Sequence, residues 1–234
     1  MKKFIRIVLI AILIVIIGVG SYGYKYYYDT TKKEPVSSKI SEIQAGPDFV
    51  KASKLPQDYL NGVVAVEDHR FYNHGALDFI GIARALVANT KAGELQEGGS
   101  SITQQVAKNL YFLNESNPFN RKLGELYVAI DLQYNYEKQE ILEIYVNSIY
   151  FGDGYYGIRE ACEGYLGKEP SEMTLAEATM MAGIPNAPSV YAPTANKKLC
   201  KERQKKVINS MVEYGYITQE QADQIDQSFI DNIK

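Results

Sequence analysis

The chain has 234 residues, of which 46% are hydrophobic and 23% are charged, so it can bury a core of ordinary size. This composition excludes wholesale disorder, a collagen-like repeat and a disulfide-stapled miniprotein. Two cysteines and two histidines, far apart in sequence, are too few for a structural zinc site, and we expect no metal site built from protein side chains alone.

The net charge of -3 conceals an uneven distribution of charge. Lys2, Lys3 and Arg6 precede an apolar run, and without them the chain holds 22 basic against 28 acidic residues, a net charge of -6. Nucleic-acid binding needs a dominant positive field. The acidic body therefore argues against nucleic acid as the main partner.

The N-terminal segment is apolar over residues 4–20 and is interrupted only by Arg6. As a helix it would extend about 25 Å, slightly less than the roughly 30 Å hydrocarbon core of a bilayer. Gly18 and Gly20 also fit the cleavage pattern of a signal peptide. An uncleaved anchor is favoured by five tyrosines that resemble an interfacial aromatic belt, namely Tyr22, Tyr24, Tyr26, Tyr27 and Tyr28.

We therefore predict three parts: a single-pass signal anchor over residues 1–28, a polar stalk over residues 29–49 and one domain over residues 50–234. Basic residues before the apolar run place the N-terminus in the cytoplasm by the positive-inside rule. The domain is then expected at the cell membrane, on its extracytoplasmic side.

The remaining chain shows helical periodicity and no sustained alternation of apolar and polar residues, which predicts an all-α domain. Pro56 is expected to open a helix that carries Leu60, Val63 and Val64. Ser101 and Gln104 form a capping box for a second helix, whose expected buried stripe is Ile102, Val106, Leu110 and Leu113.

Later helices are predicted at about residues 121–134 and 141–149. Thr174 and Glu177 cap another helix, which should stop at Gly183. A last pair should begin near Asn196 and Thr218.

Candidate chemistry begins with the segment EDHRFYNHG, residues 67–75. Glu67 and Asp68 follow apolar residues and have no neighbouring lysine, so a carboxylate at a cleft edge could act as a general base. The alternative is a solvated helix end, with Phe71 as a core anchor.

A second segment, GGSSITQQVAKNLYF, covers residues 98–112 and places two glycines and two hydroxyls before a helix start, where backbone N–H groups favour an anion. One face of this helix would carry Ser101, Gln105, Lys108, Asn109 and Phe112. A solvated face is the alternative, although an acidic protein would usually place a carboxylate there.

The third segment is RKLGE, in which Glu125 follows Arg121 and Lys122 by one turn. An exposed Arg121–Glu125 pair would be worth only a few tenths of a kcal/mol. A partly buried face is the other interpretation, and Gly124 would allow a backbone or a ligand to approach closely.

Two glutamates and a cationic cluster fit glycosyl transfer from a diphosphate donor. That reaction needs a base for the acceptor hydroxyl and cations for the departing diphosphate. Two carboxylates also fit a glycoside hydrolase of lysozyme type. A hydrolase has no diphosphate to bind, so the basic cluster of Lys108, Arg121 and Lys122 discriminates between the two.

Four segments occur in the order and approximate spacing of one family, namely EDHRFYNH, GGSSITQQVAKNL, RKLGE and EILEIYVNSIYFG. Over residues 50–193 the chain resembles the peptidoglycan glycosyltransferases of glycosyltransferase family 51. The resemblance implies a lysozyme-like helical domain with a second, membrane-contacting lobe. It also implies polymerisation of lipid II into β-1,4-linked glycan, with inversion at the anomeric carbon.

The resemblance implies that Glu67 is the catalytic base and that Glu125 is the second glutamate, near the donor diphosphate. Family donor-site positions are matched by Ser100, Gln105, Lys108, Asn109, Arg121 and Lys122. Supporting positions are matched by Asp68, Phe71, His74 and Arg84. Ala76 and Ser101 replace a glycine and a threonine of the family pattern, and neither change removes a catalytic group.

The implied partners are lipid II, the growing glycan strand and the membrane, with a separate transpeptidase as a further partner. The sequence shows no KTG or SxN set beside an SxxK and ends 41 residues after Pro193, so the closest family type is the monofunctional transglycosylase. No cofactor is required by the sequence. Whether a divalent cation, Mg²⁺ or Mn²⁺, assists the diphosphate is left open.

Two other classes stay open as alternatives: a lysozyme-like glycan hydrolase and an inactive, membrane-anchored glycan-binding module. The second would not need both glutamates. Cys162 and Cys200 are expected to be free, buried residues rather than a disulfide.

Overall fold

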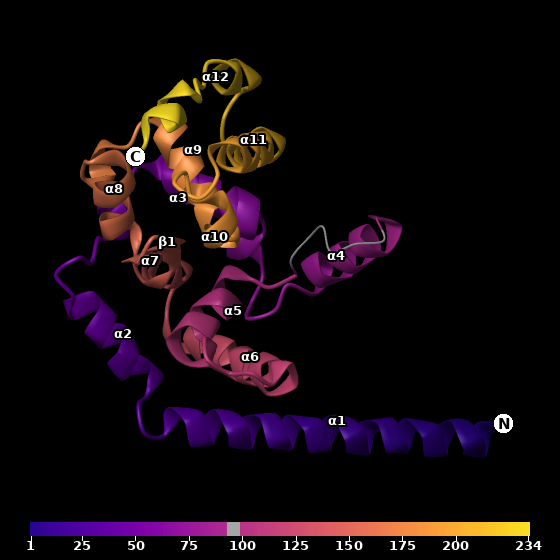
Figure 1. Ribbon diagram of the computed structural model, residues 1–234. Coiled ribbons are helices and arrows are strands. Elements are labelled where there is room, and N and C mark those ends of the chain that lie inside the picture. Colours follow the sequence, from indigo (N-terminus) through magenta and orange to yellow (C-terminus); the bar gives the residue numbers. More distant parts are fainter. Residues whose placement is uncertain (93–98) are drawn as a thin grey trace.

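The computed structural model describes residues 1–92 and 99–234, and almost every element in these ranges is helical (Figure 1). The prediction of an all-α fold is confirmed. The first helices are α1 (Lys2–Thr31), α2 (Val36–Ala45), α3 (Gln57–Glu67), α4 (Phe79–Ala92), α5 (Ile102–Ala107), α6 (Pro118–Asn135) and α7 (Lys138–Ser148). The later ones are α8 (Ile158–Leu166), α9 (Leu175–Gly183), α10 (Pro188–Tyr191), α11 (Lys197–Glu213) and α12 (Gln219–Asp223).

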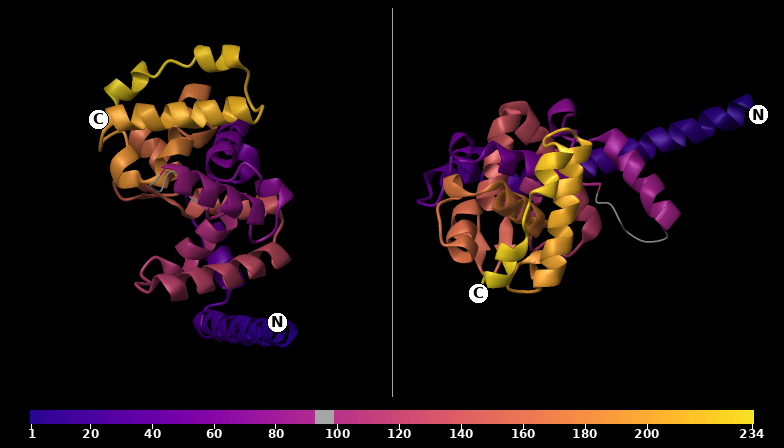
Figure 2. Two further views of the ribbon diagram at one scale, coloured as in Figure 1. Left: turned by 90° about the vertical axis from the view of Figure 1, so that its right-hand side faces the viewer. Right: turned by 90° about the horizontal axis from the view of Figure 1, so that it is seen from above.

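Short helical turns connect several of these helices. The 3-10 turns are η1 (Ala52–Lys54), η2 (Phe71–Asn73), η4 (Pro170–Glu172), η5 (Ile184–Asn186) and η6 (Ser228–Asn232). A π-helical turn, η3 (Lys108–Phe112), continues α5. Figures 1 and 2 show α8 to α12 at one end of the molecule, α5 and α6 towards the other, and α1 beyond α6.

The packing of α3 against α9 and α11 forms the centre of the upper part of the molecule. Gly62 makes this close contact feasible, because an added Cβ would lie only 3.2 Å from the Cβ of Ala182 and 3.4 Å from the sulfur of Met211. The apolar stripe predicted for this helix is buried, including Leu60, Val63 and Val64. This packing fixes the direction in which the C-terminal end of α3 points.

The predicted helix starts with caps at Ser101, Thr174, Asn196 and Thr218 are confirmed, whereas α6 and α7 each begin three residues before the predicted positions. The hydroxyl of Ser101 accepts a hydrogen bond from the N–H of Gln104, and Oε1 of Gln104 accepts one from the N–H of Ser101. Thr174 and Glu177 form the same box at α9. Asn196 and Thr218 cap α11 and α12. These caps satisfy N–H groups that a helix cannot pair internally.

The stripe predicted for the second helix is wrong at its end, because α5 stops at Ala107 and the π-helical turn follows. A π turn adds a residue to the helical repeat and rotates what comes after it. Phe112 is therefore 1% exposed, although it was expected on the polar face, and Leu113 is 57% exposed, although it was expected in the core.

The two-stranded hairpin of β1 (Tyr150–Gly152) and β2 (Tyr155–Tyr156) was not predicted. Its turn requires a left-handed backbone at Gly152, Asp153 and Gly154, with φ of 95°, 53° and 89°. Glycines tolerate this conformation at little cost. The strands are too short to show an alternating pattern.

The N-terminal part consists of two helices and a short link. α1 extends without interruption to Thr31, and α2 lies within the segment predicted as a stalk. Val36 and Ile40 of α2 are buried, and α2 contacts α6 and α7. The boundaries at residues 28 and 49 stay predictions.

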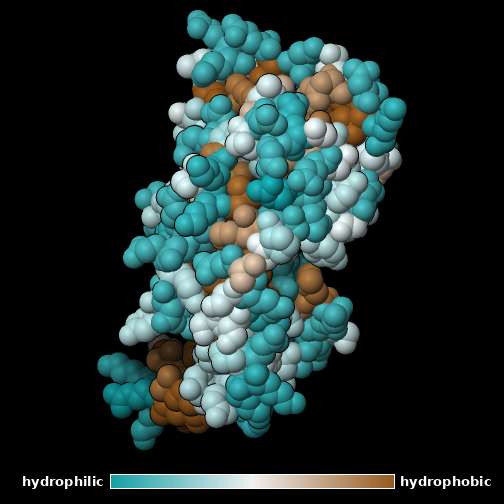
Figure 3. All heavy atoms as spheres, turned by 90° about the vertical axis from the view of Figure 1, so that its left-hand side faces the viewer, coloured by the Kyte–Doolittle hydropathy of each residue, from teal (hydrophilic) through white to brown (hydrophobic). Residues whose placement is uncertain are grey.

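α1 is long and apolar enough to cross a membrane, with a mean hydropathy of 2.8 over its most apolar 18-residue window and none of that window buried. At 1.5 Å per residue its 30 residues span about 45 Å. Figure 3 shows the corresponding dense apolar patch at the foot of the molecule, at the level of α1.

Cys162 and Cys200 are both free and buried, as predicted. Burial raises the pKa of each thiol to about 12, which leaves both as neutral thiols at physiological pH.

Gly124 was expected to allow a backbone or a ligand to approach closely, but the ring of Phe112 packs there instead. A Cβ at this position would lie 2.4 Å from Cζ of that buried ring. We expect Gly124→Ala to lower the free energy of unfolding by about 1–3 kcal/mol, the usual cost of overpacking. Gly75→Ala is the matched control, since a Cβ there meets nothing within 4 Å. Equal denaturant midpoints for the two variants would contradict this account.

Candidate active site

The structure brings most of the predicted site residues into one cleft of about 610 Å³. Its walls come from the end of α3, from α4, α5, η3 and α6, and from α11. The predicted residues that line it are Glu67, Asp68, Arg84, Ser100, Gln105, Lys108, Arg121, Lys122 and Glu125. These roles stay predictions, but their common location is a property of the fold.

Glu67 is the last residue of α3, and its side chain is 7% exposed. The Oε2 atom accepts a hydrogen bond of 3.0 Å from Nε2 of Gln105, which lies on α5. The Oε1 atom accepts one of 2.9 Å from Nη2 of Arg203, which lies on α11. Two donors therefore fix the carboxylate, and each oxygen keeps a lone pair for a further proton.

Arg203 was missed by the sequence reasoning, which noted only that Glu67 has no neighbouring lysine in its own segment. Its side chain is 6% exposed, and its Nε donates to the carbonyl of Gly183 at 3.2 Å. The signal was hidden because Arg203 lies 136 residues from Glu67, in the basic run KKLCKERQKK. Helical periodicity could have found it, since Cys200 and Val207 share its buried face.

A second cluster surrounds Glu125, whose side chain is 2% exposed on α6. Nζ of Lys122 lies 2.7 Å from its Oε2, and Nε of Arg121 lies 3.5 Å from its Oε1. Lys122 also donates to Oγ of Ser100 at 2.8 Å. The partly buried interpretation of this segment is therefore correct, and a buried carboxylate holds two cations at the cleft.

The second motif divides between the cleft and the protein interior. Gln105 also accepts from the hydroxyl of Tyr145 at 3.4 Å, and burial raises the pKa of that hydroxyl well above its usual value, so it stays a donor. Lys108 is exposed and lines the cleft. Asn109 is not among the lining residues, and its buried Nδ2 has no hydrogen-bond partner among the described residues. Gly98 lies outside the described residues.

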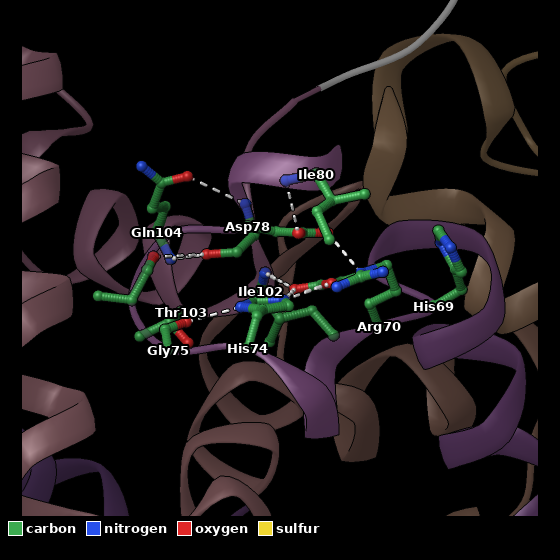
Figure 4. A network of polar contacts seen from close by, with 12 residues as sticks. His69, Arg70, His74, Gly75, Asp78, Ile80, Ile102, Thr103 and Gln104 are labelled. Carbon is green, nitrogen blue, oxygen red and sulfur yellow. Dashed lines mark hydrogen bonds and ion pairs between the residues drawn. The ribbon is translucent and has the colours of Figure 1, made fainter. Parts of the chain in front are cut away.

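Asp68 points into the wall of the cleft and ties three segments together. Its carboxylate accepts from the N–H of Ile102 at 3.1 Å, at the start of α5, and lies 2.8 Å from Nε2 of His74. Figure 4 shows His74 beside Ile102, with Nδ1 of His74 also contacting the carbonyl of Gly75 at 2.6 Å. Burial lowers the pKa of His74, but the hydrogen bonds and the charge of Asp68 outweigh it and raise the pKa overall.

The other supporting residues have separate roles. Phe71 is fully buried, as a core anchor, and the ammonium of Lys138 lies 4.4 Å from its ring centroid. Arg84 lines the cleft and contacts Nε2 of His69 at 2.7 Å. His69 stacks on Tyr214, and burial together with the charge of Arg84 lowers the pKa of this imidazole.

Asp68, His74 and Asp78 place ligand-type atoms within 4.8 Å of one another. Both ring nitrogens of His74 face oxygen acceptors, the carboxylate of Asp68 and the carbonyl of Gly75, so the imidazole has no free lone pair for a metal. Nε of Arg70 lies 3.4 Å from Asp78 and adds a positive charge. We therefore interpret the group as a structural network that holds the loop after Glu67.

The sequence profile of the transglycosylase family matches residues 34–212. The chain belongs to this family. A family of unknown function also matches residues 196–233, over the C-terminal helices. A protein of Cupriavidus necator described as a transglycosylase is 41% identical over 189 residues, which make up 81% of each chain.

Longer relatives share the same region. Penicillin-binding protein 1A of Neisseria cinerea is 40% identical over 223 residues, or 93% of this chain. The chain spans only 28% of the length of that protein and 22% of its counterpart from Neisseria lactamica. The crystal structure of penicillin-binding protein 1A from Haemophilus influenzae matches 75% of this chain and 16% of its own, at 24% identity and a TM-score of 0.45.

The two histidines predict opposite pH dependences of stability. The raised pKa of His74 means that its contribution is complete below about pH 6.5 and is lost as the pH rises through the folded-state value. The lowered pKa of His69 means that its contribution is present above that pH and is lost as the pH falls.

We expect the loss of stability caused by His74→Gln to be greater at about pH 5.5 than at about pH 9, and that caused by His69→Gln to follow the reverse order. Denaturant titrations of both variants and the parent at the two pH values measure these differences. The same trend in both variants would show that these electrostatic assignments are wrong.

Proposed function

We propose that this chain is a peptidoglycan glycosyltransferase that polymerises lipid II into β-1,4-linked glycan. The single observation that carries the proposal is the pairing, in one cleft, of an oriented carboxylate at Glu67 with a cluster of cations around Glu125. Membership of the transglycosylase family supports it.

The proposed reaction assigns the proton to Glu67. Its carboxylate accepts the proton of the acceptor 4-hydroxyl while that oxygen attacks the anomeric carbon of the donor. The bond from this carbon to the diphosphate oxygen breaks, and the diphosphate leaves with the electron pair. Attack opposite the leaving group inverts the anomeric centre. A positioned base of this kind contributes typically 10² to 10⁴-fold to the rate.

The departing diphosphate suits the other cluster. Lys122 and Arg121 present positive charge on α6, and Lys108 adds another on η3. Cations fixed where negative charge develops stabilise the transition state without reorganising. Glu125 orients Lys122 and Arg121, so we propose a donor-side role for it rather than proton transfer.

The cationic cluster also weighs against the two alternatives. A lysozyme-like hydrolase has no diphosphate to neutralise, and an inactive glycan-binding module has no need to orient Glu67 with two donors. Both oxygens of Glu125 already face cations, so the described side chains around it do not form a cage for Mg²⁺ or Mn²⁺. Such an ion would take most of its ligands from the diphosphate and water.

A lipid-linked donor fits a chain whose N-terminal helix is apolar enough to cross a membrane. We propose that α1 holds the cleft on the extracytoplasmic side of the cell membrane, where the growing strand can extend away from the lipid surface. A separate transpeptidase as partner stays a prediction.

Incubation with purified lipid II in one reaction and with finished glycan in another tests the proposal. We expect polymer from lipid II and no release of sugars from finished glycan. Release of sugars would establish the hydrolase, and inertness towards both substrates would establish the binding module.

The two glutamates should respond differently to removal of charge. Glu67→Gln should lower the polymerisation rate by about 10² to 10⁴-fold, while binding of a phosphoglycolipid inhibitor stays near that of the parent. Glu125→Gln should weaken inhibitor binding as well as the rate. Glu220→Gln, on exposed α12, is the control. The reverse pattern would exchange the two roles.

The cationic cluster predicts a loss of affinity for diphosphate groups. We expect Lys108→Ala and Arg121→Ala each to weaken binding of the phosphoglycolipid inhibitor by about 1.5–3 kcal/mol, the range for hydrogen bonds to charged groups. Fluorescence titration measures the dissociation constants. Lys198→Ala removes an exposed lysine outside the cleft and should change little. Unchanged affinity in both cleft variants would place the diphosphate elsewhere.

A further inference from the structure

The C-terminal third of α1 packs closely on α6, and two glycines make this contact feasible. A Cβ at Gly23 would lie 2.7 Å from the ring of Tyr127 and 3.5 Å from the Cβ of Leu123. A Cβ at Gly20 would lie 3.6 Å from the Tyr127 hydroxyl. Gly18 lies about one and a half turns before Gly23, and a Cβ there would meet nothing within 4 Å.

Hydrogen bonds follow the same line of contact. The hydroxyl of Tyr27 donates to Oδ2 of Asp131 at 2.7 Å, and that of Tyr127 donates to the carbonyl of Gly20 at 2.7 Å. Tyr22 donates to Oδ1 of Asn120 at 2.9 Å.

Tyr26 donates to Glu115, which lies just before α6. Three of the five tyrosines predicted as an aromatic belt therefore bind specific acceptors on the body of the protein. Tyr24 and Tyr28 are more than half exposed.

The opposite side of α6 faces the cleft. Arg121, Lys122 and Glu125 lie on this helix and line the cleft, whereas Asn120, Tyr127 and Asp131 contact α1. Figures 1 and 2 show α6 between α1 and the rest of the molecule. A shift of α6 relative to α1 would therefore move the cationic cluster relative to Glu67.

We propose that residues 20–31 of α1 form a docking surface for α6, and that the anchor thereby positions the donor side of the cleft besides tethering the domain. Gly23 and Tyr127 are positioning residues, since neither lines the cleft. The catalytic part of this proposal rests on the proposed function, whereas the docking itself does not.

Gly23→Leu tests the positioning role, with Gly18→Leu as the matched control on the same helix. In detergent, we expect Gly23→Leu to raise KM for lipid II and to weaken the phosphoglycolipid inhibitor by about fivefold or more, the lower range of coupling between sites. The value of kcat should change less. Gly18→Leu should stay within about twofold of the parent, as for substitutions that meet nothing.

Rescue separates positioning from a general loss of structure. Tyr127→Ala removes the ring that a side chain at Gly23 would strike, so the Gly23→Leu/Tyr127→Ala double variant should recover most of the lost affinity. Equal behaviour of Gly23→Leu and Gly18→Leu, or failure of the double variant to recover, would overturn the positioning role.

Crosslinking tests the docking without any catalysis. The 3.5 Å between Cβ positions at residues 23 and 123 suits a disulfide. On the Tyr127→Ala background, Gly23→Cys/Leu123→Cys should crosslink readily under mild oxidation, and Gly18→Cys/Leu123→Cys should not. The native thiols are buried and neutral and will not compete. Equal crosslinking of both pairs, or of neither, would overturn the docking. Crosslinking in an inactive protein would refute only the proposed function.

Discussion

The cleft depends on two adjacent carboxylates that bind different partners. The carboxylate of Glu67 accepts hydrogen bonds from Arg203 and Gln105. The carboxylate of Asp68 contacts His74 and accepts a hydrogen bond from the N–H at the start of α5. Because both belong to the end of α3, the packing of that helix on α9 and α11 sets the position of both. A carboxylate at a helix N-terminus is favoured by the dipole, so Asp68 also helps α5 to begin where it does.

Sequence and structure agree best where the determining contacts are local. The capping boxes at Ser101 and Thr174 need only four consecutive residues, and the pairing of Lys122 with Glu125 needs one helical turn. Such interactions are fixed by spacing alone, so most helix starts and the cluster on α6 could be predicted.

The features that were missed depend on contacts between distant segments. Arg203 looks like part of a solvated basic run until α11 packs on α3 and turns it towards Glu67. The π turn η3 changes which residues of the segment face the core. It turns Phe112 inward, and the ring of Phe112 packs against Gly124 of α6. Helical periodicity places Arg203 on the buried face of α11, but it does not show that this arginine meets Glu67.

The length of α1 has a consequence for the lipid around the protein. Its unpacked apolar part, residues 4–19, extends only about 24 Å, against a hydrocarbon core of roughly 30 Å. A helix held against α6 from residue 20 onward cannot slide outward to relieve this mismatch, so in a bilayer that it crosses either the lipid thins or the basic side chains of Lys2, Lys3 and Arg6 extend to the headgroups. In a bilayer with longer acyl chains the mismatch would be larger, and the resulting force on α1 would act on its contact with α6.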